Sequence, residues 1–359
     1  MKGFDMNKKI VFTGGGTAGH VTPNIALLPF LKKEGYDAYY IGSYNGIEKK
    51  LMEDFDVPYY GISTGKFRRY FDLKNLSDPF RVLKGYSQAL KILKELKPDI
   101  VFSKGGFVSV PVVRAAASLK IPCIIHESDM TPGLANKLCI PVATKVCCNF
   151  PETIKYVPAG KAVLTGSPIR TELTQGSKLA ALELCGFTAN KPVVMVIGGS
   201  QGATSVNVMV REALPKLLED FQVVHICGKD KVDNLMLTVP GYKQFEYLKS
   251  DLKDVFAMAD VVVSRAGANA ICELLALKKP NLLIPLQAGS RGDQILNARS
   301  FEEQGFSMTV REDFIDCDIL TDKIKELYEN RQMYVDKMCE SNQMNSIPTI
   351  MELIKEHSK

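Results

Sequence analysis

Residues 14–24, GGGTAGHVTPN, follow directly on the apolar run KKIVFT at 8–13. An apolar run that ends in a glycine-rich turn before a helix is typical of the first strand and helix of a Rossmann-like domain. The turn fits the dinucleotide pattern G-x-G-x-x-G at Gly14, Gly16 and Gly19. That pattern also requires an acidic residue at the end of the second strand, where it binds ribose, but residues 41–45 contain none. The stretch therefore favours an oxyanion-binding loop over a nicotinamide site.

Short apolar runs alternate with helical patterns along nearly the whole chain. Because the runs are continuously apolar, they indicate strands covered on both faces, as in parallel sheets between layers of helices. This alternation predicts a doubly wound α/β architecture. The expected strands are 8–14, 37–43, 58–63, 99–105, 122–128 and 162–166 in the first half, and 191–199, 221–228, 243–248, 260–267, 280–286 and 306–310 in the second.

The length of the chain predicts two domains, because 359 residues exceed the size at which one hydrophobic core keeps growing. The sequence GGSQGA at 198–203 again places a glycine-rich turn after an apolar run, as at the start of the chain. The polar, turn-rich stretch 167–190 lies between these two repeats. We expect the domains to join there.

Two dipeptides predict where helices begin in the first half. Thr22 is expected to cap a helix whose first residue is Pro23. Asp78-Pro79 is expected to start, in the same way, a helix that runs to Lys97.

Composition narrows the class of protein. Hydrophobic residues make up 46% and charged residues 24%, and no apolar stretch is long enough to span a bilayer, so we expect a cytoplasmic globular protein. The net charge of +5 comes without an RNA-binding motif, so no nucleic-acid partner is expected. The nine cysteines lack C-x-x-C spacing and the four histidines form no H-x-x-x-H pair. We therefore expect reduced thiols, no metal site and no cofactor.

Glycine-rich loops follow three of the expected strands, at 14–19, 105–106 and 198–202. Glycines let backbone N–H groups approach an oxyanion closely, and the start of the following helix adds a favourable dipole. In doubly wound domains such ligands bind at the carboxyl ends of the strands. The three loops together favour a phosphorylated ligand.

Six motifs occur along the chain in this order: GGGTAGHVTPN, SKGGFVSVP, HESDMTPGLANK, TGSPIR, GGSQGA and RAGANAICELL with RGDQILNA. In order and spacing they resemble the MurG-type UDP-N-acetylglucosamine transferases of glycosyltransferase family 28. The resemblance implies a GT-B fold, in which two Rossmann-like domains face each other across a cleft. It also implies that the protein transfers GlcNAc from UDP-GlcNAc to undecaprenyl-linked lipid I. This reaction is a step of peptidoglycan synthesis, and so of cell-wall biogenesis, and it is needed for cell shape and cell division.

The resemblance also implies a division of labour between the domains. Residues 1–168 would form the acceptor and membrane side, and 169–345 would bind UDP-GlcNAc. The last helix, 346–359, would return to pack on the first domain.

Donor-side residues follow from the matched motifs. Glu273 would accept hydrogen bonds from the ribose hydroxyls, although a glutamate early in a helix can also simply complement the helix dipole. Ser200 would meet the diphosphate, Arg170 would contact the donor, and Gln294 would read hydroxyls of GlcNAc. The family often has two glutamines where this chain has Asp293 and Gln294, so the role of Asp293 is less defined. The other expected donor neighbours are Thr17, Gly19, Gln201, Gly202, Leu248, Ala268 and Asn269.

The acceptor side contains two candidates for the general base. A neutral His20 imidazole could remove the proton from the acceptor's 4-hydroxyl, although a histidine there could instead cap the turn. Asp129 stands where many relatives carry asparagine, and its carboxylate could be the base, orient His20 or bind the acceptor. The remaining acceptor-side residues are Lys104, Gly105, Gly106, Glu127 and Asn136.

A basic and aromatic stretch predicts contact with a membrane. Residues 66–97 contain nine Lys or Arg against three acids, interleaved with aromatic and apolar side chains. Such a segment can bind an anionic lipid surface. We expect 66–86 to contact the inner face of the cell membrane as a peripheral attachment. Three leucines of the following helix are expected in the domain core: Leu83, Leu90 and Leu93.

Other functions stay open at this level. A related lipid glycosyltransferase with a diacylglycerol acceptor would share the donor half. A UDP-GlcNAc epimerase would share the two-domain layout without depending on an acceptor. A non-catalytic nucleotide-sugar-binding protein would have no use for His20. Cell-wall synthesis complexes are possible protein partners.

Overall fold

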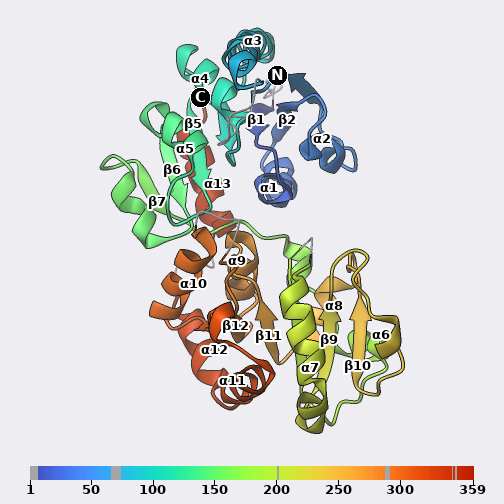
Figure 1. The fold of residues 1–359 in the computed structure, drawn as a ribbon. Helices are drawn as coiled ribbons and strands as arrows, with labels where there is room; N and C mark the ends of the chain where they lie inside the picture. Colours follow the sequence, from blue (N-terminus) through green and yellow to red (C-terminus); the bar gives the residue numbers. More distant parts are fainter. Residues whose placement is uncertain (1–6, 66–73, 200–201, 288–291, 342, 344–345) are drawn as a thin grey trace, which may run out of the picture. The chain divides into compact units, whose positions relative to one another are not determined.

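A computed structural model describes residues 7–65, 74–199, 202–287, 292–341, 343 and 346–359 (Figure 1). The chain divides into two compact units, Met1–Arg170 with Asn345–Lys359, and Thr171–Met344. Each unit contains one sheet whose paired strands are parallel, with helices between successive strands. The predicted α/β class with two Rossmann-like domains is therefore confirmed.

The first unit has a seven-stranded sheet with the order β3-β2-β1-β4-β5-β6-β7. The sequence predicted all of these strands except β6, whose residues KVCC contain a single β-branched side chain and a lysine and so do not stand out as an apolar run. The two adjacent cysteines of β6 are buried and reduced. The strands are β1 (Lys8–Thr13), β2 (Tyr36–Ser43), β3 (Tyr59–Ile62), β4 (Ile100–Ser103), β5 (Cys123–Glu127), β6 (Lys145–Cys148) and β7 (Ala162–Leu164).

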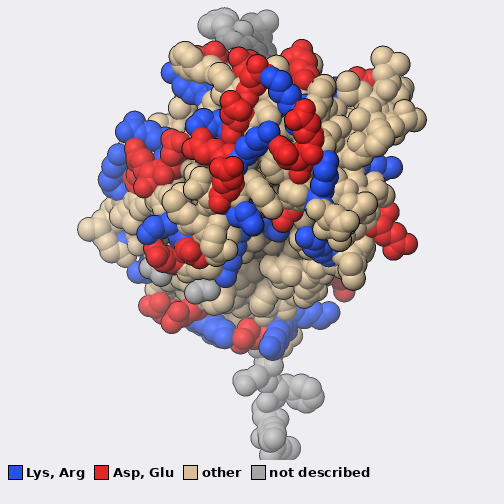
Figure 2. All heavy atoms as spheres, turned by 90° about the horizontal axis from the view of Figure 1, so that it is seen from below, with Lys and Arg blue, Asp and Glu red and all other residues tan. Residues whose placement is uncertain are grey.

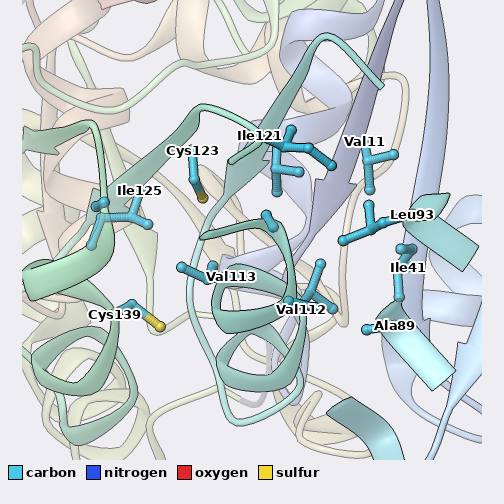
Figure 3. Close-up of a cluster of buried hydrophobic side chains, with 14 of the residues drawn as sticks. Val11, Ile41, Ala89, Leu93, Val112, Val113, Ile121, Cys123, Ile125 and Cys139 are labelled. Carbon is cyan, nitrogen blue, oxygen red and sulfur yellow. The ribbon is translucent and has the colours of Figure 1, made fainter. Parts of the chain in front are cut away.

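Both faces of this sheet are covered, as the continuous apolar strands predicted. Val11 of β1 points into a cluster with residues of α3 and α4, such as Leu93 and Val112 (Figure 3). Its neighbours Ile10 and Phe12 pack on the opposite face, in the cluster that includes residues of α1 and α13. The helices of the unit are α1 (Thr22–Lys33), α2 (Ile47–Met52), α3 (Lys74–Leu96), α4 (Ser109–Ser118), α5 (Leu134–Cys139) and α13 (Ser346–His357), with 3₁₀ helices η1 (Ala18–His20), η2 (Ile140–Val142) and η3 (Pro151–Tyr156).

The C-terminal helix α13 belongs to the first unit, although almost all of the second unit precedes it in the chain. Ser346 at its start donates a hydrogen bond from Oγ to the carbonyl oxygen of Ser167 at 2.9 Å. Near its end, the hydroxyl groups of Ser358 and Tyr36 lie 3.0 Å apart. The helix is thus fastened to this unit at both ends.

Both predicted helix starts were wrong. Thr22 is the first residue of α1 and Val21 occupies the cap position; the Thr22 hydroxyl donates instead to the carbonyl of Ala18. Because α3 begins at Lys74, Asp78-Pro79 lies inside this helix and does not start it.

The prediction that Leu83 is buried was also wrong, since this residue of α3 is 65% exposed. Ala89 and Leu93 form the buried stripe of the helix. At 3.6 residues a turn, Leu83 points about 80° away from Leu93 and about 120° away from Ala89. Leu90 is partly buried against the core, as expected.

The second unit has a six-stranded sheet with the order β10-β9-β8-β11-β12-β13, and each of its strands falls on a predicted run. The strands are β8 (Val193–Ile197), β9 (Gln222–Ile226), β10 (Tyr242–Phe245), β11 (Val261–Ser264), β12 (Asn281–Leu283) and β13 (Met308–Thr309). The helices are α6 (Lys178–Cys185), α7 (Thr204–Asp220), α8 (Leu252–Met258), α9 (Ala268–Ala276), α10 (Asp293–Glu303), α11 (Cys317–Glu329) and α12 (Arg331–Cys339), with 3₁₀ helices η4 (Thr171–Thr174), η5 (Asn234–Met236) and η6 (Glu312–Phe314).

Charge is mixed on the face seen in Figure 2, where Lys and Arg side chains alternate with Asp and Glu. Among the residues that the structure describes, none of the helices has the length and apolar character needed to cross a membrane.

Candidate functional site

The first two glycine-rich loops meet at the point where the order of the first sheet reverses. β1 and β4 are neighbours there, and backbone bonds join the loops that follow them. Lys104 N–H donates to the Thr13 carbonyl at 2.9 Å, and Gly15 N–H donates to the Gly105 carbonyl at 3.3 Å. Gly106 has a φ of +86°, and a Cβ there would overlap the Gly15 carbonyl. Such a switch point is where doubly wound sheets bind ligands.

A cavity of about 340 Å³ opens beside these loops. A second cavity of about 470 Å³ adjoins it and shares Gly16, Ser43, Glu48 and Thr64 with it. The first cavity is lined by Gly15, Gly16, Thr17, His20, Ser43, Glu48, Thr64, Gly106, Phe107 and Val108.

His20 ends the 3₁₀ helix η1, and its ring is turned back toward the glycine loop. Its Nδ1 lies 2.9 Å from the Gly15 carbonyl oxygen and 3.3 Å from Thr17 Oγ1. Because a carbonyl only accepts hydrogen bonds, the neutral ring carries its proton on Nδ1 and its lone pair on Nε2. Burial lowers the pKa of His20; Lys104 lowers it too, whereas the Gly15 carbonyl and Glu48 raise it. A His20 pKa below its usual value keeps the ring neutral near pH 7.

Glu48 is the residue of this site that sequence reasoning missed. It is buried, and its carboxylate accepts hydrogen bonds from Gly16 N–H at 3.2 Å, Ser43 N–H at 3.0 Å and the Ser43 hydroxyl. A Cβ on Gly15, Gly42 or Gly46 would overlap its side chain. In the sequence, the only signal is that a carboxylate closely follows two of these glycines, in GSYNGIE at 42–48.

Lys104 follows β4, and its side chain extends toward the carboxyl end of the neighbouring strand β5. It is 1% exposed, with Nζ 2.8 Å from His126 Nδ1 and 2.6 Å from Ser128 Oγ. On its other side, His126 Nε2 lies 2.9 Å from the Gly166 carbonyl. The lysine predicted beside the acceptor diphosphate therefore contacts the β5 segment and is not among the residues lining the 340 Å³ cavity.

Glu127 and Asn136 shape the loop that carries Asp129. The Glu127 carboxylate accepts from Asp129 N–H and Gly133 N–H, each at 3.0 Å, and from Asn136 Nδ2 at 2.8 Å. Burial raises the pKa of Glu127, and these hydrogen bonds oppose the rise. Asp129 itself is half-buried. Two predicted acceptor residues thus support the loop of the third.

In the second unit, the glycine-rich loop after β8 is only partly described. Ser200 and Gln201 lie outside the described residues. Gly202 has a φ of +68°, donates its N–H to the Gly199 carbonyl at 3.0 Å, and has no room for a Cβ against the Cys227 carbonyl.

The predicted ribose-binding segment forms α9, which begins directly after the loop that follows β11. Gly267 precedes the helix, and Ala268, Asn269 and Glu273 are all half-buried on it. Asn269 and Glu273 are four residues apart and so share one face of the helix.

The remaining donor candidates lie apart in the chain. Asp293 and Gln294 begin α10, where the Gln294 side-chain oxygen accepts from Leu286 N–H at 3.0 Å. That bond fixes the amide of Gln294 against the segment after β12. Leu248 follows β10 and Arg170 ends the first segment of the first unit; both are half-buried.

Arg265 connects several loops of the second unit and was also missed. Its guanidinium pairs with both carboxylate oxygens of Glu312, at 2.9 and 2.8 Å. It also donates to Ser205 Oγ at the start of α7 and to the Ile284 carbonyl after β12, each at 3.0 Å. One side chain thus fixes the ends of three neighbouring strand-to-helix connections. No pattern along the chain indicates these contacts, because the partners of Arg265 are far apart in sequence.

The two units define a class of protein. Each is a Rossmann-like parallel sheet with a glycine-rich loop after its first strand, and one of them places an imidazole beside a glycine-lined cavity. Two such domains, with glycine-rich loops at the carboxyl ends of their first strands, are typical of proteins that bind nucleotide ligands. Within the described residues no cluster of three His, Cys, Asp or Glu is placed to hold a metal ion.

Comparison with known proteins makes the assignment specific. The glycosyltransferase family 28 N-terminal domain matches residues 10–148, and the C-terminal domain of the same family matches 193–354. A UDP-N-acetylglucosamine–N-acetylmuramyl-(pentapeptide) pyrophosphoryl-undecaprenol N-acetylglucosamine transferase from Lachnospira eligens is 65% identical, covering 98% of this chain and all of the relative. The transferase of the same name from Lachnoclostridium phytofermentans is 60% identical, covering 97% of this chain and 99% of the relative.

A solved structure agrees with these relatives. The crystal structure of Acinetobacter baumannii MurG is similar with a TM-score of 0.77 and 27% identity, over 97% of this chain and 99% of that one. The chain belongs to glycosyltransferase family 28. The resemblance seen in its motifs is confirmed, and family membership makes it a glycosyltransferase.

Proposed function

We propose that this chain transfers GlcNAc from UDP-GlcNAc to the 4-hydroxyl of N-acetylmuramic acid in lipid I, giving lipid II for peptidoglycan synthesis. Relatives that match the whole chain at 60–65% identity carry the name of this transferase. The observation that carries the proposal is the His20 ring beside the glycine-lined cavity, with its proton held on Nδ1 by the Gly15 carbonyl.

The reaction is an inverting displacement. The acceptor oxygen forms a bond to the anomeric carbon as the bond from that carbon to the UDP oxygen breaks, and UDP leaves with the electron pair. The lone pair on His20 Nε2 takes the proton of the attacking hydroxyl. Because the pKa of His20 is lowered, the ring is ready to accept a proton at neutral pH. The protein requires no metal ion in this scheme.

The second unit binds the donor. Glu273 on α9 accepts hydrogen bonds from the ribose hydroxyls, with Asn269 on the same helix face. The turn before α7, with Ser200 and the neighbouring backbone N–H groups, stabilises the negative charge that grows on UDP. Gln294 and Asp293 at the start of α10 bind the GlcNAc hydroxyls.

The test is UDP release from UDP-GlcNAc with and without a short-chain lipid I analogue. We expect acceptor-dependent release in the wild type. His20→Ala should lower kcat by about 10²–10⁴-fold, whereas Glu273→Ala should mainly raise the KM for UDP-GlcNAc. If Asp129→Asn abolished kcat and His20→Ala did not, the base would be Asp129.

Two outcomes would contradict the assignment. Conversion of the donor without acceptor would indicate an epimerase or hydrolase, and donor binding without turnover would indicate a different acceptor or a binding protein. A diacylglycerol acceptor in place of the lipid I analogue distinguishes the related lipid glycosyltransferases.

The protein is also proposed to attach peripherally to the cytoplasmic face of the membrane. On α3, Phe80 is 74% and Leu83 65% exposed, next to exposed Arg81 and Lys84. Residues 66–73 of the predicted membrane segment lie outside the described part. A surface of exposed apolar and basic side chains can enter an anionic lipid interface, with about 1 kcal/mol from each basic residue.

Liposome sedimentation tests this attachment. The double variant Phe80→Ser/Leu83→Ser should bind anionic liposomes more weakly than the wild type. Phe314→Ser, which replaces a 64% exposed side chain of the second unit, serves as the matched control and should bind like the wild type. Equal sedimentation of all three proteins would exclude α3 as the contact.

A further inference from the structure

A single peptide group connects His20 with Glu48. The N–H of Gly16 donates to Glu48 Oε2 at 3.2 Å, and the carbonyl of Gly15 lies 2.9 Å from His20 Nδ1. This N–H and this carbonyl belong to the same amide, the bond between Gly15 and Gly16. The carboxylate and the imidazole are therefore in contact through one planar, conjugated group.

Such a chain of hydrogen bonds is cooperative. A carboxylate that accepts from an amide N–H polarises the amide, which makes its carbonyl oxygen a stronger acceptor. The stronger acceptor favours the imidazole tautomer that carries a proton on Nδ1. In Ser-His-Asp triads a carboxylate sets the histidine tautomer through direct contact; here the peptide group stands between the two side chains.

We propose that Glu48 is a positioning residue, which holds the His20 ring with its proton on Nδ1 and its Nε2 lone pair available to the acceptor hydroxyl. The consequence for catalysis rests on the proposed function of His20 as general base. The effect on the tautomer does not depend on that function.

The surroundings hold the connection in place. Glu48 Oε1 accepts from Ser43, whose carbonyl in turn accepts from the Tyr59 hydroxyl at 2.5 Å. The Tyr59 ring stacks on Tyr40 with centroids 5.8 Å apart, and the Tyr40 hydroxyl donates to the Gly14 carbonyl at 2.9 Å. Hydrogen bonds thus hold the glycine loop at the Gly14 carbonyl and at the Gly16 N–H. A Cβ on Gly15, Gly42 or Gly46 would overlap the Glu48 side chain, so these glycines make room for it.

Two charged groups act on His20 from the elements packed around it. Glu48 on α2 raises the pKa of His20, and Lys104 at the end of β4 lowers it. Loss of the carboxylate charge therefore lowers the pKa of His20 further. A weaker base with a mixed tautomer should remove the acceptor proton more slowly, without any change in donor binding.

The variant Glu48→Gln tests the connection. Gly16 N–H and Ser43 N–H donate to different oxygens of the Glu48 carboxylate. A glutamine has an accepting oxygen at only one of these two positions, so one of the two N–H groups loses its acceptor. Ser43→Ala is the matched control, because it removes the hydroxyl contact to Oε1 and leaves Gly16 N–H bonded to Oε2. The thermal unfolding midpoints of both variants are measured as well, so that a loss of stability is not mistaken for a loss of the connection.

The first measurement is ¹⁵N NMR of histidine-labelled full-length protein, in which His20→Ala assigns the His20 signals among four histidines. The wild type and Ser43→Ala should show the proton on Nδ1. Glu48→Gln should show a mixture of tautomers and a lower pKa. A wild-type His20 with its proton on Nε2, or an unchanged tautomer in Glu48→Gln, would overturn the proposal, and the wild-type result needs no variant to fold.

The second measurement is the pH profile of acceptor-dependent UDP release. Glu48→Gln should lower kcat about ten-fold, shift the acid limb to lower pH and leave the KM for UDP-GlcNAc unchanged. A fall in kcat with an unchanged acid limb would indicate a structural effect and overturn the positioning role. If His20→Ala retained wild-type turnover, the base assignment would fail while the NMR result still decided the role of Glu48.

Discussion

The ammonium group of Lys104 lies 2.8 Å from Nδ1 of His126, inside the first unit. Because an ammonium only donates, Nδ1 accepts, and the His126 ring carries its proton on Nε2, which donates to the Gly166 carbonyl. Burial and the nearby Lys104 hold the pKa of His126 well below its usual value. His126 is thus a neutral structural bridge from β5 to the segment after β7. Unlike His20, it is not among the residues that line the 340 Å³ cavity.

Lys104→Met tests this bridge. The substitution leaves His126 Nδ1 and Ser128 Oγ without the ammonium donor in a buried site, which costs about 1–3 kcal/mol. We expect a lower unfolding midpoint in urea, and a higher pKa for His126 in NMR titration because the nearby positive charge is gone. An unchanged His126 pKa would contradict the direct contact.

The pH dependence of stability should reveal the buried carboxyl of Glu127. Its pKa in the folded protein is raised, so the protonated form is favoured by folding. That contribution is fully present below the carboxyl's unfolded pKa and is lost as pH rises through the higher folded value. In Glu127→Gln the loss is absent, so the stability of the variant relative to the wild type should increase over that pH range. Thermal unfolding midpoints of both proteins, measured from pH 4 upward, check the direction; a constant difference would refute it.

Alanine substitutions at two glycines with similar φ angles separate the free-energy cost of the backbone conformation from the cost of steric overlap. Gly106 has a φ of +86° and lies against the Gly15 carbonyl, whereas Gly160 has a φ of +80° and nothing within 4 Å of its Cβ position. Gly160→Ala should cost about 1–2 kcal/mol for the left-handed backbone. Gly106→Ala should cost more and also reduce turnover, because the two loops beside His20 must separate. Equal losses in urea unfolding would mean that the close approach is not required.

Loss of the Arg265 side chain should destabilise the protein more than loss of an exposed arginine of the same unit. Arg265→Met breaks a bidentate ion pair in which the Arg265 side chain is 9% exposed and the Glu312 side chain 21% exposed. This loss should lower the free energy of unfolding by about 2 kcal/mol. It should also raise the KM for UDP-GlcNAc, since the loops at the carboxyl ends of β8, β11 and β12 lose a common anchor. Arg311→Met, which breaks an exposed pair with Asp313, is the control and should leave the free energy of unfolding nearly unchanged. Similar effects of the two variants would show that burial of the Arg265 pair contributes nothing.

Local patterns in the sequence were sufficient to predict twelve of the thirteen strands in the described part of the chain, and their alternation with helices. Twelve apolar runs marked strands because parallel strands are apolar on both faces, a property that each run carries by itself. β6 was missed because its residues KVCC, with one β-branched side chain and a lysine, do not form an apolar run. A capping residue before a proline indicates a helix start without determining it: α1 begins one residue before Pro23, and α3 five residues before Pro79.

The sequence by itself determined the family, the glycine-rich loops and His20, because each is a short motif whose residues are consecutive. Only the tertiary structure decided that Glu48 reaches His20 through the Gly15–Gly16 peptide, and that Lys104 contacts His126 across two strands. The same holds for Arg265, whose partners come from distant segments. The physical reason is that a hydrogen bond depends on distances of about 3 Å in space, which the fold sets and which separation along the chain does not reveal.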